Sequence, residues 1–236
     1  MTDTLMVGVS GVRGIVDKDL TPEIVTRWAR AFGRWAADRT PLVVVGRDSR
    51  QSGPRFARAV HEGLIAAGCS VIDVGLVPTP TIQMAVEFHE AGGGIAVTAS
   101  HNPGEWNALK FIGPDGIFLD GADGVRVADW AASGENDGAR AAGDPPGVTT
   151  DDGAIERHLA RVLALPAVDV ERIRSRRFRV ALDTVRGAGG VIMPTLLERL
   201  GCAVWGLELM PDGQFPRAPE PVPEHLGALA NAVRKS

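Results

Sequence analysis

Several residue types and patterns are scarce in this chain of 236 residues, and their scarcity excludes whole classes of protein. Tyrosine is absent, and aromatic residues make up only 5% of the chain. The two cysteines, Cys69 and Cys202, lie far apart in apolar surroundings, which predicts buried thiols and excludes a disulfide framework or a metal knuckle. No apolar run approaches the roughly 20 residues that span a bilayer, and no basic segment followed by an apolar one opens the chain. We therefore expect a cytoplasmic protein without a membrane partner.

An excess of positive charge is also lacking. The chain has 25 lysines and arginines against 29 acidic residues, a formal net charge of −4. This balance gives no indication of a nucleic-acid partner. The remaining composition, 44% hydrophobic and 23% charged, is typical of a globular protein, and the length allows one large domain or two small ones.

Helical and strand patterns alternate along the chain. Thr21 and Pro22 provide a capping hydroxyl and a proline at the first helical position, which predicts a helix start. Further helices are expected at 56–67, 81–90, 123–132, 154–163 and 191–200. Short apolar strands are expected at 42–45, 70–74, 94–98, 109–112, 178–182 and 203–207. This alternation predicts a layered α/β fold in which helices cover the sheet.

A stretch rich in glycine and proline, residues 134–153, predicts a boundary between two domains. We expect a first domain at 1–140, a linker at 141–152 and a second domain at 153–236. The halves resemble each other, since each contains a strand, a polar loop, a helix, the pair Gly-Cys and a second strand. This pattern favours an internal duplication.

Three polar segments at expected strand ends carry the candidate chemistry. They are residues 10–14 (SGVRG), 46–53 (GRDSRQSG) and the loop around Ser100. Glycines let the backbone approach an anion, and guanidinium groups bind its oxygens. Arg13, Arg47 and Arg50 are therefore predicted to surround a phosphate near Ser100. The alternative for the Ser100 loop is a turn that only ends the strand.

His101 follows Ser100 directly, and neighbours in an extended segment face opposite ways. We therefore expect the His101 ring to point away from the Ser100 hydroxyl, which disfavours a hydrolase of the Ser-His type. The segment 186–190 (RGAGG) raises the alternative of a nucleotide-dependent oxidoreductase, with Glu208 as the ribose acid. Its glycine spacing departs from G-x-G-x-x-G and favours a tight turn instead.

Taken together, these segments resemble the α-D-phosphohexomutases, the group of phosphoglucomutase, phosphomannomutase and phosphoglucosamine mutase. Residues 98–103 (TASHNP) match the family's phosphoserine loop. Residues 8–14 resemble its Gly-Thr-Ser/Asp-Gly-x-Arg-Gly segment, with Val9 in place of threonine, and residues 46–53 resemble its Gly-Arg-Asp-x-Arg-x-Ser-Gly loop. Residues 180–190 and 211–226 resemble its second domain. The sequence of residues 105–110 (EWNALK) is most similar to that of phosphoglucosamine mutases.

The resemblance implies two consecutive three-layer α/β/α domains with mixed, mostly parallel sheets, the second incomplete. It implies a phosphotransferase that interconverts hexose 6-phosphate and 1-phosphate through a bisphosphate. Ser100 would carry the phosphoryl group, with Arg13, His101 and Lys110 as further catalytic candidates. Arg13, Arg47, Asn102 and Lys110 would bind the phosphate or the substrate. Such transfers depend on positioning and charge neutralisation.

The resemblance also implies Mg²⁺ in the full-length enzyme, bound to a phosphate oxygen on Ser100 and to three aspartates, and a hexose 1,6-bisphosphate as activator. The family's Asp-x-Asp-x-Asp-Arg loop has no counterpart before Ser236, and Asp120 and Asp123 are too isolated to replace it. We therefore expect little or no mutase activity from this polypeptide alone.

The partner implied is a small phosphosugar, with glucosamine 6-phosphate favoured and glucose or mannose phosphates as alternatives. A non-catalytic phosphosugar-binding module remains a second hypothesis. The sheet edges of an incomplete second domain would favour a homo-oligomer.

Overall fold

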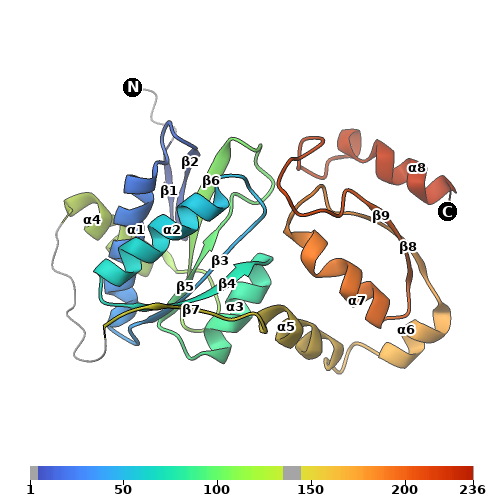
Figure 1. Cartoon of the computed structure of the whole chain (residues 1–236), viewed down its shortest axis with the longest axis horizontal. Helices are drawn as coiled ribbons and strands as arrows, with labels where there is room; N and C mark the ends of the chain where they lie inside the picture. Colours follow the sequence, from blue (N-terminus) through green and yellow to red (C-terminus); the bar gives the residue numbers. More distant parts are fainter. Residues whose placement is uncertain (1–4, 135–144, 236) are drawn as a thin grey trace.

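The computed structural model describes residues 5–134 and 145–235, which form two modules side by side (Figure 1). We call residues 5–134 together with 145–163 the first module, and residues 170–235 the second module. The first module contains a large sheet with helices on both faces. The second contains a small sheet with short helices around it.

The first module is built on a seven-stranded sheet in the order β1-β2-β6-β5-β3-β4-β7. The pairs β5-β3, β3-β4 and β4-β7 are parallel. The pairs β1-β2, β2-β6 and β6-β5 are antiparallel. The predicted mixed sheet is thus confirmed. The strands are β1 (Met6–Gly8), β2 (Gly11–Ile15), β3 (Leu42–Arg47), β4 (Ser70–Leu76), β5 (Gly93–Val97), β6 (Trp106–Ile112) and β7 (Val148–Thr150).

Helices cover both faces of this sheet, which makes the first module a three-layer α/β/α unit. Along β3, Val43 and Val45 pack into one core and Val44 packs into the other, because successive strand residues face opposite ways. The first core contacts α1, α2 and α4, and the second contacts α3 and α5. These helices are α1 (Pro22–Ala37), α2 (Gly53–Ala66), α3 (Thr79–Phe88), α4 (Gly121–Ser133) and α5 (Ala154–Leu163).

The expected start of α1 is confirmed. The Thr21 hydroxyl accepts a hydrogen bond from the backbone N–H of Ile24 at 3.4 Å, and Pro22 is the first helical residue. From there Trp28, Phe32 and Trp35 are buried at helical spacing and form the centre of the first core.

The segment expected to link two domains contributes to the first module. Its residues 141–144 lie outside the described residues, whereas Val148–Thr150 form β7 and pair with β4. Helix α5 follows, and its Ala154 is buried in the second core. The chain leaves the first module after α5, and the boundaries expected at 140 and 153 remain predictions.

The second module contains two parallel strands, β8 (Arg179–Asp183) and β9 (Ala203–Leu207), joined through α7 (Met193–Arg199). Glycines with positive φ, Gly68 at 83° and Gly201 at 71°, stand just before Cys69 and Cys202 and end the helical segments. The unit β8-α7-β9 therefore repeats β3-α2-β4, which agrees with the expected duplication. The remaining elements are α6 (Val170–Arg176), η1 (Ala188–Val191), η2 (Pro223–His225) and α8 (Gly227–Lys235).

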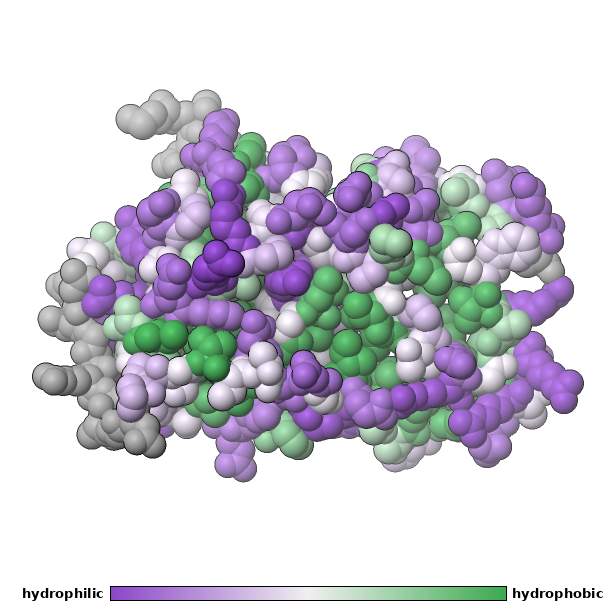
Figure 2. Space-filling view, in the orientation of Figure 1, coloured by the Kyte–Doolittle hydropathy of each residue, from purple (hydrophilic) through white to green (hydrophobic). Residues whose placement is uncertain are grey.

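The second module buries little apolar surface. Among its described residues, Ile192 and Ala232 are the buried hydrophobic side chains, while Trp205 on β9 is 48% exposed. Figure 2 shows green, apolar residues gathered over α7 on this face. Two strands with short helices cannot enclose a full core. Across the described residues, no helix has both the length and the apolar character needed to cross a membrane.

Candidate functional site

The Ser100 loop connects the end of β5 to the start of β6. Its tip is bent, because Ser100 has a φ of 57°, in the left-handed region that non-glycine residues rarely adopt. Two hydrogen bonds support this bend. The Ser100 N–H donates to the Thr98 hydroxyl at 3.1 Å, and the Thr98 hydroxyl donates to a carboxylate oxygen of Asp48 at 2.6 Å. Ser100 itself is exposed at the tip.

Arg50 holds the loop from inside. Its side chain is buried, and each of the five guanidinium N–H groups has an acceptor. Nε donates to Asp48 at 3.1 Å, and the two terminal nitrogens donate to backbone carbonyls of the loop at 2.6–3.0 Å. Those carbonyls belong to Ser100, Asn102, Pro103 and Trp106. No N–H remains for an anion, so the expectation that Arg50 binds a phosphate is wrong.

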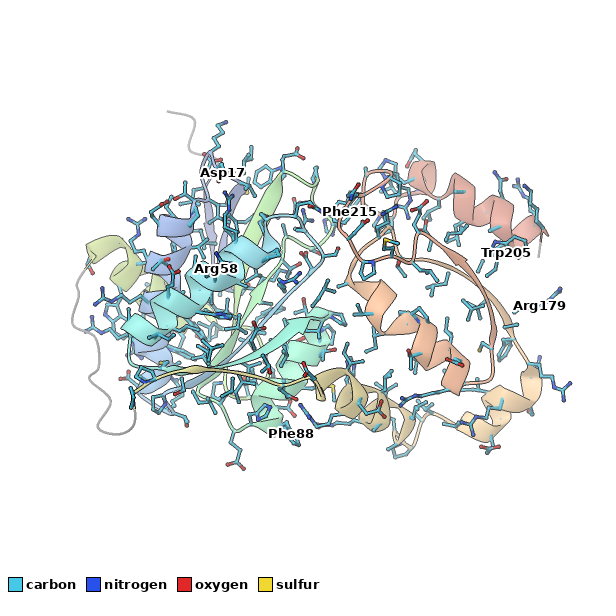
Figure 3. All side chains as sticks on the ribbon, in the orientation of Figure 1. Asp17, Arg58, Phe88, Arg179, Trp205 and Phe215 are labelled. Atoms are coloured by element: carbon cyan, nitrogen blue, oxygen red, sulfur yellow. The ribbon has the colours of Figure 1, made fainter. Side chains whose placement is uncertain are left out.

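The second module packs against the same anchor. The ring of Phe215 lies 5.3 Å from the Arg50 guanidinium, and Figure 3 shows Phe215 in the loop that faces the first module. The Ser49 hydroxyl donates to the backbone oxygen of Arg186 at 2.9 Å. Burial raises the pKa of Asp48, and the hydrogen bonds from Thr98 and Arg50 oppose that shift. The polar network under Ser100 is thus buried between the two modules.

A pocket of about 320 Å³ opens on one side of Ser100, and we call it the cationic pocket. It contains Arg13 and Lys110, which lie on the paired strands β2 and β6. Burial and the neighbouring Arg13 lower the pKa of Lys110. The loop predicted at 10–14 was wrong for Arg13, since that residue is part of the strand Gly11–Ile15. Gly11, one of the glycines that suggested a loop, instead allows β2 to approach Leu109 of β6 closely.

A second pocket, of about 390 Å³, opens on the other side, and we call it the intermodule pocket. Its lining comes from both modules, with Pro78 and Thr79 at the start of α3 and Gly187 and Ala188 at the start of η1. Ser100 and His101 line both pockets. Ser100 is therefore bordered by a cationic pocket on one side and by a pocket formed by both modules on the other.

The His101 ring faces the Ser100 hydroxyl, so the prediction that it points away is wrong. Its Nδ1 lies 3.3 Å from the serine Oγ, and its Nε2 lies 3.0 Å from a carboxylate oxygen of Glu220 in the second module. The prediction assumed an extended backbone. Because Ser100 is left-handed, the alternation of neighbouring side chains does not hold here.

The other predicted site residues divide into two groups. Asn102 lines the cationic pocket, and its side-chain amide donates to the carbonyl of Ala99 at 2.6 Å. Arg47 lines neither pocket, and its guanidinium donates to the backbone oxygen of Asp48 at 3.2 Å. The structure therefore brings Arg13, Lys110 and Asn102 to Ser100, but it does not bring Arg47 there.

The residues that the structure describes form neither a metal site nor a dinucleotide site. Within residues 5–134 and 145–235, no three His, Cys, Asp or Glu side chains converge as metal ligands would. Asp48, next to the serine loop, is occupied by Thr98 and Arg50, so these residues do not fit Mg²⁺. At the 186–190 segment, Arg186 pairs with Asp212 and Glu208. The four-residue η1 contains the last glycines, and α7 begins only at Met193. The segment is therefore a tight turn, and no α-helix begins at these glycines, as a pyrophosphate site would need.

Two family models match the chain. Domain I of phosphoglucomutase/phosphomannomutase, described as alpha/beta/alpha, matches residues 4–136, and domain II matches residues 156–236. The chain belongs to the phosphoglucomutase/phosphomannomutase family. The three-layer fold and the expected second domain of this family are thereby confirmed.

The matches to relatives in this family extend over nearly all of the chain. A phosphoglucomutase/phosphomannomutase of Thermococcus kodakarensis is 41% identical over 96% of this chain and 50% of its own length. A probable phosphoglucosamine mutase of Methanosarcina acetivorans is 41% identical over 96% of this chain and 49% of its own length. A crystal structure of a putative phosphomannomutase from Thermus thermophilus has a TM-score of 0.81 at 28% identity, and the match covers 99% of this chain and 52% of that one. The chain spans about half the length of the relatives it matches.

Proposed function

We propose that this chain provides the phosphoserine site of a phosphohexomutase, an enzyme that interconverts hexose 6-phosphates and 1-phosphates through a bisphosphate. One observation carries the proposal: an exposed serine, held in a strained conformation by a buried network, borders a pocket that contains Arg13 and Lys110. Strain at an exposed nucleophile is expected where it preorganises a reaction. A structural turn would not need five hydrogen bonds from Arg50 beneath it.

We assign roles to the side chains on the basis of their positions. Arg13 and Lys110 neutralise the charge of the phosphoryl group that moves between Ser100 and a sugar oxygen. Asn102 keeps the loop closed through its bond to Ala99. His101 exchanges a proton with the serine oxygen.

The names of the relatives support a hexose phosphate as substrate. Relatives named as phosphoglucosamine mutases support glucosamine 6-phosphate, and the relative from Thermococcus kodakarensis supports glucose or mannose phosphates. We favour glucosamine 6-phosphate, on the similarity of 105–110 to phosphoglucosamine mutases.

The free thiols of Cys69 and Cys202 fit a reducing compartment such as the cytoplasm, and burial raises the pKa of Cys69 to about 11.

The proposal is tested by phosphate uptake. The 236-residue chain is incubated with glucose 1,6-bisphosphate and Mg²⁺, and its intact mass and peptide masses are measured. We expect one phosphoryl group on Ser100 and none in the Ser100→Ala variant. Uptake at another residue would contradict the proposal. Binding of hexose phosphates without uptake would instead support a non-catalytic phosphosugar-binding module.

We further propose that this chain does not complete a mutase cycle alone, because its described residues hold no cluster of carboxylates for Mg²⁺. A coupled assay with glucosamine 6-phosphate or glucose 1-phosphate tests this. We expect turnover no higher than in the Ser100→Ala variant. Sustained turnover that depends on Ser100 would overturn this part of the proposal.

A further inference from the structure

The carboxylate of Glu220 stands close to a site that is otherwise built for an anion. Its Oε2 lies 3.0 Å from Nε2 of His101, whose Nδ1 lies 3.3 Å from the Ser100 oxygen. A carboxylate near a phosphate site is unfavourable unless it has a partner. Glu220 lines neither pocket, although Pro219 and Pro221 on either side of it line the intermodule pocket. It therefore faces the imidazole and does not line the space where a phosphate would bind.

The segment that carries Glu220 is stiff. Pro219 and Pro221 flank it, so the φ angles on both sides are fixed, and the residue before a proline is confined to extended conformations. The Nδ1 of His225 lies 2.7 Å from the backbone oxygen of Glu220 and donates to it. The carboxylate is thus presented to His101 from a preorganised backbone.

From these contacts we propose that Glu220 is a positioning residue, which fixes the orientation and tautomer of His101 so that His101 accepts the proton of the Ser100 hydroxyl. Glu220 accepts the hydrogen bond of the neutral imidazole at Nε2, which leaves the lone pair on Nδ1 for the serine. The inference rests on the proposed function for its chemical consequence. The orientation and tautomer that it assigns to the His101 ring apply to the chain without any phosphate as well.

With this arrangement, the step in which Ser100 regains a phosphoryl group proceeds as follows in bonds and protons. The serine oxygen forms a bond to phosphorus, and the bond between phosphorus and the sugar oxygen breaks. The serine proton moves to Nδ1 of His101 and then to the departing sugar oxygen, which leaves as a hydroxyl. His101 returns to its neutral form, and Glu220 compensates the positive charge that the ring holds in between.

This role also explains why the second module reaches the serine. The His101–Glu220 pair crosses from one module to the other, and both side chains are about half exposed, at 57% and 44%. An ion pair with that exposure contributes little to stability. A purely structural role would therefore leave a substitution of Glu220 without consequence.

The test compares Glu220→Gln with Glu224→Gln, a substitution of an exposed glutamate in the same segment. In the wild-type chain we expect the ¹⁵N shifts of the His101 ring, measured where the ring is neutral, to place the proton on Nε2. In Glu220→Gln we expect both tautomers, and in Glu224→Gln the wild-type spectrum. A wild-type ring protonated on Nδ1, or an unchanged spectrum in Glu220→Gln, would overturn the inference.

Kinetics provide the second measurement. The rate of phosphate transfer from glucose 1,6-bisphosphate to Ser100 should fall about tenfold in Glu220→Gln and stay within twofold in Glu224→Gln, because a positioned base typically contributes a hundredfold or more. An equal rate in all three proteins would refute the role of Glu220 while leaving the proposed function intact. If the wild-type chain takes up no phosphate, the proposed function fails, and the ring spectra still decide the positioning of His101.

Discussion

The strongest consequence of the structure concerns Arg50, which connects the serine loop to the core through five hydrogen bonds. Replacing it with methionine leaves the buried carboxylate of Asp48 without its cation, and breaking such a pair typically costs about 3–5 kcal/mol. Four loop carbonyls lose their donors as well, although water reaches part of the loop. We expect Arg50→Met to lower the free energy of unfolding by about 4 kcal/mol.

A gentler substitution separates charge from geometry. Arg50→Lys keeps the positive charge but cannot reproduce the planar fork, so most of the five bonds are lost. We expect it to cost about 2–3 kcal/mol. Asp48→Asn in the Arg50→Met background removes the unpaired charge, so the double variant should be more stable than the sum of the two single effects by about 1 kcal/mol or more.

Urea unfolding followed by tryptophan fluorescence measures these effects. Four of the five tryptophans, Trp28, Trp35, Trp106 and Trp130, lie in the first module, and the chain has no tyrosine to contribute. The signal therefore reports on the module that contains Arg50. A loss below about 1 kcal/mol in Arg50→Met, or strict additivity in the double variant, would refute the account of Arg50 as the anchor of the loop.

Three further predictions follow from single contacts. Arg13→Ala should weaken the binding of inorganic phosphate, measured by calorimetry, about tenfold, because a charge-assisted hydrogen bond is lost. Lys18→Ala serves as the control and should bind phosphate like the wild type. Equal affinities in the two variants would contradict phosphate binding in the cationic pocket. Ser100→Gly should be about 1 kcal/mol more stable than Ser100→Ala, because glycine adopts the positive φ without strain, and equal melting temperatures would refute that strain. A hydrogen bond from Arg186 lowers the pKa of Asp212 to about 2. The ionised Asp212 carboxylate therefore stabilises the folded chain fully above its unfolded pKa of about 3.9, and this contribution is lost as the pH falls toward 2. The difference in urea midpoint between wild type and Asp212→Asn should therefore narrow below about pH 4, and a constant difference would contradict it.

Much of the fold could be predicted from periodicity. The expected helix at 154–163 and the strand at 203–207 agree with α5 and β9 in both bounds. Other elements were missed, and for two of them, β2 and β7, the reason can be identified. Strand β2 contains Gly11 and Gly14, which are typical of loops, and it is held in place by pairing with β6. Strand β7 is three exposed residues beside a proline-rich stretch, and only the free edge of β4 makes it a strand.

The candidate site could be predicted by residue type more readily than by orientation. The residue pattern identified Arg13 and Ser100, and the family resemblance added Lys110; the structure brings all three to one pocket. The residue pattern assigned Arg50 to an anion, because nothing local indicates that four loop carbonyls surround that guanidinium. It also missed Glu220, since the contact with His101 depends on how the two modules pack. The proline on either side of that glutamate was the available signal of a fixed position.

The proposed function requires that the Ser100 oxygen accept a phosphoryl group. The most direct measurement is peptide mass analysis of the wild-type chain after incubation with glucose 1,6-bisphosphate, beside Ser100→Ala and Arg13→Ala. We predict one phosphoryl group on the wild-type peptide that contains Ser100, much slower uptake in Arg13→Ala, and none in Ser100→Ala. A wild-type chain that binds the bisphosphate yet leaves Ser100 unmodified would contradict the account.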